Sequence, residues 1–286
     1  MEQQANPVTK QKFKIAAPNG EAVDLKKCVE SGTGGLVFFG HLVLWTLVVI
    51  LSVASGGILL IVMLFAPLIE AFNRKKAEAT LRGSALQIGP NQFGELYESA
   101  KIIAQRLGLK NVPDIFLLED NTINAAAGKV GSRSVIVLVD DTVNACILTG
   151  NLQSLNFILA HEMAHHAFGH TNMIRGYLSQ MLKSLSRKDE FSCDRVASEI
   201  VNDSEAAVDA LCILLAGPQL YPYLERDALI QQAAQVERNK HSKKAEKTMT
   251  HPLMLRRIYR ALGGDAEAYA STRAATVEPI PEKSSF

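Results

Sequence analysis

The most constraining feature of this sequence is a stretch from Ser31 to Ile69 that contains no Asp, Glu, Lys or Arg. Its apolar centre, from Leu36 to Leu68, is longer than a core helix of a soluble protein needs to be. As one straight helix the whole stretch would be about 58 Å long, about twice the thickness of the hydrocarbon layer of a bilayer. We therefore predict a transmembrane segment at residues 36–70, with the lipid bilayer as a partner.

The sequence allows two arrangements of this segment. Residues 54–57 (Ala-Ser-Gly-Gly) lie near its middle and can form a turn. Lys26 and Lys27 precede the segment and residues 74–76 (Arg-Lys-Lys) follow it, which favours a hairpin with both ends in the cytoplasm. The alternative is one span followed by an interfacial segment, which would place the two flanks on opposite sides. The second half is short for a full span, so both arrangements stay open.

The segment also divides the chain into parts. We expect a polar, flexible or lightly structured N-terminal arm at residues 1–35, which cannot be a secretory signal peptide because the apolar run begins too late. After the transmembrane segment at 36–70 we expect a juxtamembrane helix or linker at 71–90. A folded domain then occupies residues 91–270, and a polar tail with two prolines, predicted to be disordered, occupies residues 271–286.

Charge and cysteine content exclude some classes of function. Lysine and arginine number 30 and aspartate and glutamate 29, so no basic excess indicates a nucleic-acid partner. The cysteines have no paired spacing of the kind found in zinc ribbons or redox motifs, and we interpret them as reduced thiols. They are Cys28, Cys146, Cys193 and Cys212.

Residues 91–270 have mainly helical periodicity. A helix is predicted at 95–107 and two short strands at 114–118 and 134–139. Further helices are predicted around residue 160 and at 188–201, 206–215 and 253–262. We therefore predict a mainly α fold (α+β) with a small sheet, preceded by a transmembrane hairpin or span.

The clearest chemical motif is His161-Glu162-Met163-Ala164-His165. It lies in a run without Gly or Pro before Gly169, which predicts one helix. Residues four apart share a helix face, so His161 and His165 can present two imidazoles to one zinc ion. Glu162 can then act as the general base on a water molecule, as in metallopeptidases that carry H-E-x-x-H.

A catalytic zinc needs a third protein ligand and an open fourth position. Glu190 and Asp194 are also four residues apart, so they share a face of a second helix. Glu190 would complete a His-His-Glu ligand set, and Asp194 would orient an imidazole ligand from behind.

Two residues further along the chain are candidates for the same site. His251 could stabilise an oxyanion, and Arg257 could assist it or neutralise charge. Both enter the prediction as catalytic residues, although the sequence does not place either of them beside the metal. We interpret His166 as structural and do not assign His170 to the site.

These motifs, in this order, resemble those of the membrane-bound zinc metallopeptidases of the HtpX and CAAX-prenyl-protease type. The resemblance covers roughly residues 92–263 and includes Gly169-His170 and Thr250-His251-Pro252. It implies one Zn²⁺ per chain on His161, His165 and Glu190, with Glu162 as the base and His251 and Arg257 beside the site. It also implies an edge strand that receives an extended peptide substrate, formed by Asn124, Ala125, Ala126 and Ala127.

The sequence departs from this family at Ala126, where an aromatic residue is usual, and at Cys193, where alanine is usual. HtpX also has a second hydrophobic hairpin between the motif helix and the third ligand, whereas residues 171–189 here are polar. The resemblance is therefore to a compact catalytic domain, anchored only at its N-terminal side.

We predict a membrane-anchored zinc endopeptidase with a zincin-like domain at 91–270. We expect this catalytic domain on the cytoplasmic side of the membrane and a role in membrane-protein quality control. The alternative is a catalytically silent, membrane-anchored zinc-binding scaffold. Because Glu162 is present, we favour the enzyme. The sequence does not indicate the natural substrate or the oligomeric state.

Overall fold

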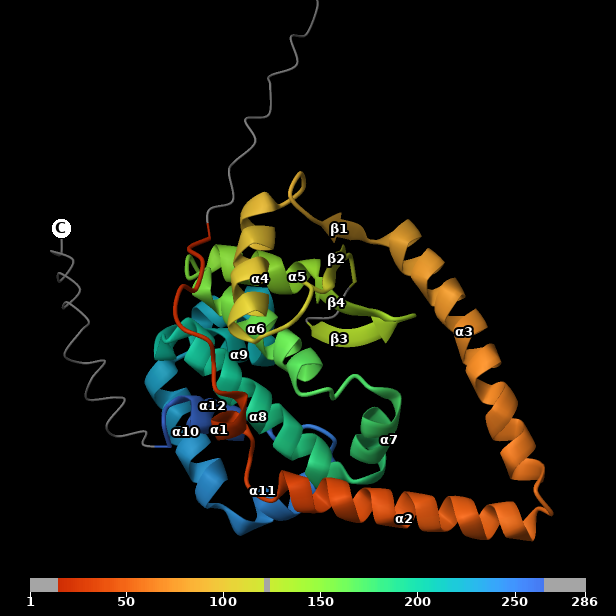
Figure 1. The fold of residues 1–286 in the computed structure, drawn as a ribbon. Helices are drawn as coiled ribbons and strands as arrows, with labels where there is room; N and C mark the ends of the chain where they lie inside the picture. Colours follow the sequence, from red (N-terminus) through yellow and green to blue (C-terminus); the bar gives the residue numbers. More distant parts are fainter. Residues whose placement is uncertain (1–14, 121–123, 265–286) are drawn as a thin grey trace, which may run out of the picture.

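The computed structural model describes residues 15–120 and 124–264 (Figure 1). These residues form a mostly helical structure with one small mixed sheet, as the sequence predicts. The predicted tail at 271–286 and the first part of the arm lie outside the described residues. The first half of the chain forms α1 (Leu25–Cys28), α2 (Thr33–Ala54), α3 (Ile58–Ser84), β1 (Leu86–Ile88), α4 (Gly94–Arg106), β2 (Asp114–Leu118), β3 (Ala125–Val130), β4 (Arg133–Val139) and α5 (Asp140–Leu148). The second half forms α6 (Gln153–Ala167), α7 (Met173–Met181), α8 (Lys183–Val201), α9 (Ser204–Leu220), η1 (Tyr221–Tyr223), α10 (Arg226–Arg238), α11 (Lys240–Ala245), η2 (Glu246–Thr248) and α12 (Met254–Ala261).

The long uncharged stretch forms α2 and the first half of α3, with a turn between them. Gly56 and Gly57 adopt φ values of 61° and 90°, which glycine tolerates without the steric cost that a Cβ atom would add. The two helices diverge from this turn as the legs of a V (Figure 1). Within the described residues, α2 is the one helix whose length and apolar composition suit a membrane span. α3 continues without a break to Ser84, so most of the expected juxtamembrane linker is helix.

The described part of the N-terminal arm packs against the folded domain. Ile15 and Cys28 are buried in the main hydrophobic core. The backbone N–H of Ile15 donates to Glu95, and the Arg106 guanidinium donates to the carbonyl of Pro18. These contacts give residues 15–30 a fixed path over α4 and α8.

Glu30 ends this path just before α2 begins. Its carboxylate accepts hydrogen bonds from Arg195 on α8, at 2.7 Å, and from Arg260 on α12, at 3.0 Å. Its backbone N–H donates to Ser192 on α8 at 2.9 Å, and Lys188 on the same helix donates to the Ser31 carbonyl. The start of α2 is therefore tied to two helices of the folded domain.

The sheet has the strand order β1-β2-β4-β3. β2 and β4 are parallel and coincide with the two strands predicted from sequence, whereas β1 and β3 are antiparallel to their neighbours. β3 occupies one edge and pairs along its whole length with β4, with Ala127 opposite Ile136. The core between the sheet and the helices contains large buried side chains from α4, β4 and α6. They include Leu96, Ile103, Ile136, Leu138, Phe157 and Leu159.

Candidate metal centre and active site

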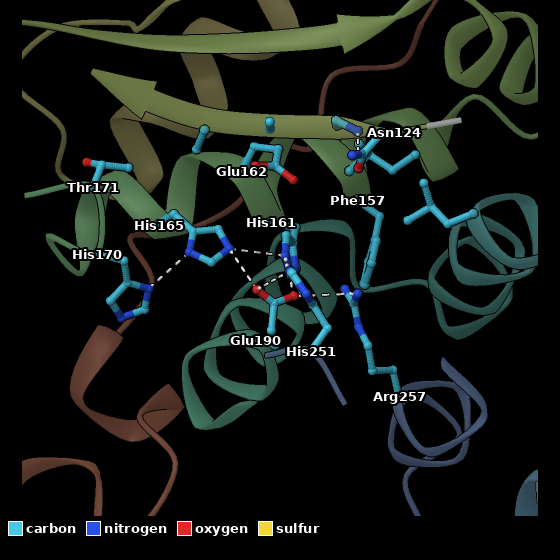
Figure 2. A pocket seen from close by; sticks show the side chains of 15 residues that line it. Asn124, Phe157, His161, Glu162, His165, His170, Thr171, Glu190, His251 and Arg257 are labelled. Atoms are coloured by element: carbon cyan, nitrogen blue, oxygen red, sulfur yellow. Dashed lines mark hydrogen bonds and ion pairs between the residues drawn. The ribbon is translucent and has the colours of Figure 1, made fainter. Parts of the chain in front are cut away.

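Helix α6 carries the first three residues of the candidate site. His161, Glu162 and His165 lie on its buried side, and the Nε2 atoms of the two histidines are 3.3 Å apart (Figure 2). This separation follows from helix geometry, since residues four apart project from one face.

Helix α8 brings Glu190 to the same point. Its Oε2 lies 3.5 Å from His161 Nε2 and its Oε1 lies 3.5 Å from His165 Nε2. Two ligand atoms about 2.0–2.1 Å from a tetrahedral zinc ion are about 3.3 Å apart, so the two nitrogens and the Glu190 carboxylate fit one zinc coordination sphere. The same three side chains form a group that could hold a metal ion.

The second nitrogen of His161 faces Asp194. His161 Nδ1 lies 2.8 Å from Asp194 Oδ1, and Arg257 donates two hydrogen bonds of 2.8 and 2.7 Å to the same carboxylate. Arg257 Nη1 also lies 3.5 Å from Glu190 Oε2. A carboxylate behind Nδ1 holds the proton on that nitrogen and leaves Nε2 free to bind a metal. Asp194 thus lies where the sequence argument expects it, and Arg257 neutralises Asp194 and Glu190 together.

The second nitrogen of His165 faces His170, which sequence reasoning left out of the site. The two Nδ1 atoms are 3.1 Å apart, and His170 Nε2 lies 3.3 Å from Asp189 Oδ1. Asp189 in turn accepts hydrogen bonds from Arg175 and Ser179. A metal on His165 Nε2 requires the proton on Nδ1, so the direction of donation is fixed from His165 to His170 to Asp189.

Two of the three candidate ligands have protonation states that suit a metal ion. Burial alone would lower the pKa of His161, but its contacts with Asp194 and Glu190 raise it to about 10. Burial and the neighbouring His161 lower the pKa of His165 to about 4, so its imidazole is neutral at pH 7. Burial opposes ionisation of Glu190, yet the His161 imidazole and the Arg257 guanidinium hold the pKa of Glu190 well below its usual range. Glu190 and His165 therefore already have the protonation states that a metal ligand needs.

Glu162 is buried beside these ligands and faces strand β3. Burial raises the pKa of its carboxyl group to about 7, although the neighbouring His161 acts to lower that pKa. The Ala127 backbone N–H also lowers this pKa. Metal ligands, Glu162 and residues 124–127 line one cleft of about 410 Å³ (Figure 2).

His251 also lines this cleft but lies at its rim. Its side chain is 65% exposed, and its Nε2 is 3.7 Å from Glu190 Oε1. The structure therefore brings together all residues that the sequence singled out, with His251 as the most solvent-exposed of them. His166 points away and contacts the Val135 carbonyl and Thr171, as expected for a structural residue.

Two protein-family models match the chain. Peptidase family M48 matches residues 90–178, and Peptidase U49 matches residues 137–268. Over these residues the chain is similar to M48-type peptidases. Together the two matches cover the α6 motif, the α8 carboxylates and α12. Searches of curated proteins and of solved structures gave no match.

One departure from the family lies inside the site. Cys193 lies three residues after Glu190 on α8 and is fully buried. Its sulfur is 3.7 Å from His170 Nδ1. Burial raises the pKa of this thiol well above its usual range, so it remains protonated. In the peptidase domain Cys193 therefore packs against the imidazole that supports His165.

Proposed function

We propose that the protein is a membrane-anchored zinc endopeptidase. The observation that carries this proposal is the spacing of His161 Nε2, His165 Nε2 and the Glu190 carboxylate. The two nitrogens are 3.3 Å apart, and each lies 3.5 Å from one of the two carboxylate oxygens. Oxygen and nitrogen donors at this spacing beside a buried glutamate are typical of zinc peptidases.

Each residue has a distinct role in the proposed reaction. His161, His165 and Glu190 would hold Zn²⁺, which when bound would supply Lewis-acid chemistry to water and to the scissile carbonyl. Glu162 accepts the proton of the attacking water and delivers it to the leaving amine. His251, at the rim, is placed to donate to the oxyanion, and Arg257 keeps Asp194 and Glu190 ionised.

The edge strand β3 supports an extended substrate. The Val139 N–H donates to the Asn124 carbonyl, which makes residue 124 part of a hydrogen-bonded pair with β4. Pairs alternate along an antiparallel ladder, so the backbone C=O groups of Ala125 and Ala127 and the Ala127 N–H face the open edge, while the Ala125 N–H donates to Asn124 Oδ1. A peptide could add there as a further strand through backbone hydrogen bonds. Such recognition reads little of the side-chain sequence, which suits removal of damaged membrane proteins.

The α2–α3 hairpin supports membrane anchoring. Its apolar side chains are largely exposed, with Phe38 73% and Val53 78% accessible. The arm before the hairpin and the peptidase domain after it pack together, so both ends of the hairpin lie on one side of any membrane it enters. This geometry favours the hairpin over a single complete span. The basic residues at both ends favour the cytoplasmic side.

The proposal is tested with detergent-purified protein, wild type against Glu162→Gln. We expect one bound zinc in both and cleavage of casein by the wild type alone. Zinc in both proteins without cleavage in either would favour the silent scaffold. Absence of zinc from both would refute the metal centre.

A further inference from the structure

Helix α7, which lies between the motif helix and α8, has an exposed apolar face. Met173, Ile174, Tyr177 and Met181 are 59%, 41%, 60% and 44% accessible. Leu178, which borders this face four residues after Ile174, is fully buried. No Asp or Glu occurs between Thr171 and Lys188. The interval that the sequence presented as polar therefore contains a helix with one apolar, acid-free surface.

This helix lies between the legs of the α2–α3 hairpin. On one side Leu178 and Leu182 pack so closely on Gly40 of α2 that a Cβ atom there would lie 3.0 to 3.1 Å from them. On the other side Met173 lines a cavity together with Met63 and Ala66 of α3. Figure 1 shows α7 at the wide end of the V, away from the turn.

Both contacts fall within the uncharged part of the hairpin. Gly40 precedes Ser55 by fifteen residues, about 22 Å of helix, and Met63 and Ala66 follow Gly57 by six and nine residues, about 9 and 14 Å. α7 therefore lies beside the apolar part of both legs. The nearby cationic side chains, Lys75, Lys129 and Lys183, are exposed or half-buried.

We propose that α7 is an interfacial helix whose face of Met173, Ile174, Tyr177 and Met181 lies in the lipid surface across the mouth of the hairpin. This inference rests on the proposed membrane anchoring. Lipid is the occupant because the face continues the exposed apolar surface of α2 and α3, and because apolar side chains with lysines around them suit the boundary between acyl chains and anionic head groups.

The consequence concerns the substrate. Thr171 lines the catalytic cleft and lies two residues before the start of α7. A helix bound to the membrane at this point holds the cleft at the bilayer surface. The substrate class is then polypeptide segments that lie at this surface, such as the juxtamembrane segments of other membrane proteins.

The test uses full-length protein with single cysteines labelled by the fluorophore NBD, in vesicles of phosphatidylcholine and phosphatidylglycerol. The variants are Tyr177→Cys and Met181→Cys on α7, Val53→Cys at the hairpin turn and Gln231→Cys on the exposed face of α10. The four native cysteines are buried, so unmodified protein measures background labelling. Quenchers are lipids with a doxyl group at a shallow or a deep acyl position, and aqueous iodide.

We expect blue-shifted emission at 177 and 181, quenched most by shallow doxyl lipid and little by iodide. Position 53 should be quenched most by deep doxyl lipid, and position 231 by iodide alone. If 177 and 181 behave like 231 while 53 is quenched by lipid, the α7 inference is overturned and the anchor stands. If the fluorophore at position 53 is also not quenched by doxyl lipid, the proposed membrane anchoring itself is wrong. Protection of 177 and 181 from both quenchers would indicate a protein partner and would equally overturn the inference.

Discussion

Replacement of His170 by alanine should weaken zinc binding without removing any zinc ligand. His165 can bind a metal through Nε2 only when its proton is on Nδ1, and that proton is donated to His170 Nδ1 at 3.1 Å. In the metal-free variant the proton can move to Nε2, which faces Glu190 Oε1 at 3.5 Å. The penalty of an unpaired buried N–H therefore arises mainly when the metal binds.

The size of the effect follows from this difference. An unsatisfied buried donor costs about 1–3 kcal/mol. At 1.4 kcal/mol per tenfold change, this predicts a dissociation constant for zinc about 5- to 150-fold higher in His170→Ala. His170→Gln, whose amide oxygen can accept a hydrogen bond, should recover part of the loss.

The assay is competition for zinc between the purified protein and a chromogenic chelator. The matched control is His166→Ala, because His166 follows His165 on α6, is half-buried and makes hydrogen bonds that do not involve the ligands. We expect the control to lower thermal stability but to leave zinc affinity unchanged. Equal zinc affinities in wild type and His170→Ala, or equal losses in both alanine variants, would refute the reasoning.

Three further predictions concern the edge strand, the hairpin and the arm. Ala127→Pro removes an N–H that faces the cleft, so this variant should keep the melting temperature of the wild type and lose peptidase activity. Ala126→Pro removes a hydrogen bond between β3 and β4, so this variant should unfold at a lower temperature. Equal stability of the two variants would contradict the assigned ladder. Gly40→Leu should destabilise the protein by about 1–3 kcal/mol in detergent, because the new side chain overpacks against α7. Gly35→Leu should not, because no atom lies within 4 Å of its Cβ position. Denaturant titration of the two variants would measure the difference in their free energies of unfolding. Burial raises the pKa of Glu30, but hydrogen bonds from Arg260 and Arg195 outweigh burial and lower it. The ionised Glu30 carboxylate should therefore stabilise the folded protein fully above about pH 4.5, and this stabilisation should be lost as pH falls through the lowered pKa. Glu30→Gln should then be less stable than wild type at pH 7, and a difference that persists at low pH would argue against an ionic contribution.

The sequence was most informative where one helix fixes the geometry. The i, i+4 spacing of His161 and His165 and that of Glu190 and Asp194 predict their shared faces directly. How closely α6 and α8 approach each other depends on packing, and only the resemblance to a family supplied that expectation.

Features that depend on tertiary contacts were missed. His170 reaches His165 because Gly169, at φ 72°, reverses the chain after α6, and spacing alone does not signal this. β3 is poor in β-branched residues and is a strand because it pairs with β4. The arm reads as polar because few of its side chains, among them Ile15 and Cys28, are buried.

The contacts of Glu30 have a consequence for the order in which the protein forms during synthesis. Its partner Arg260 follows it by 230 residues, which takes roughly 10 to 50 s to translate. The hairpin emerges from the ribosome long before α12, so it can reach the bilayer before α8 and α12 are fixed against the arm. Under the proposed function, a peptidase assembled in this order would complete its metal centre only after its anchor is in place, which would limit cleavage of other nascent chains by unattached enzyme.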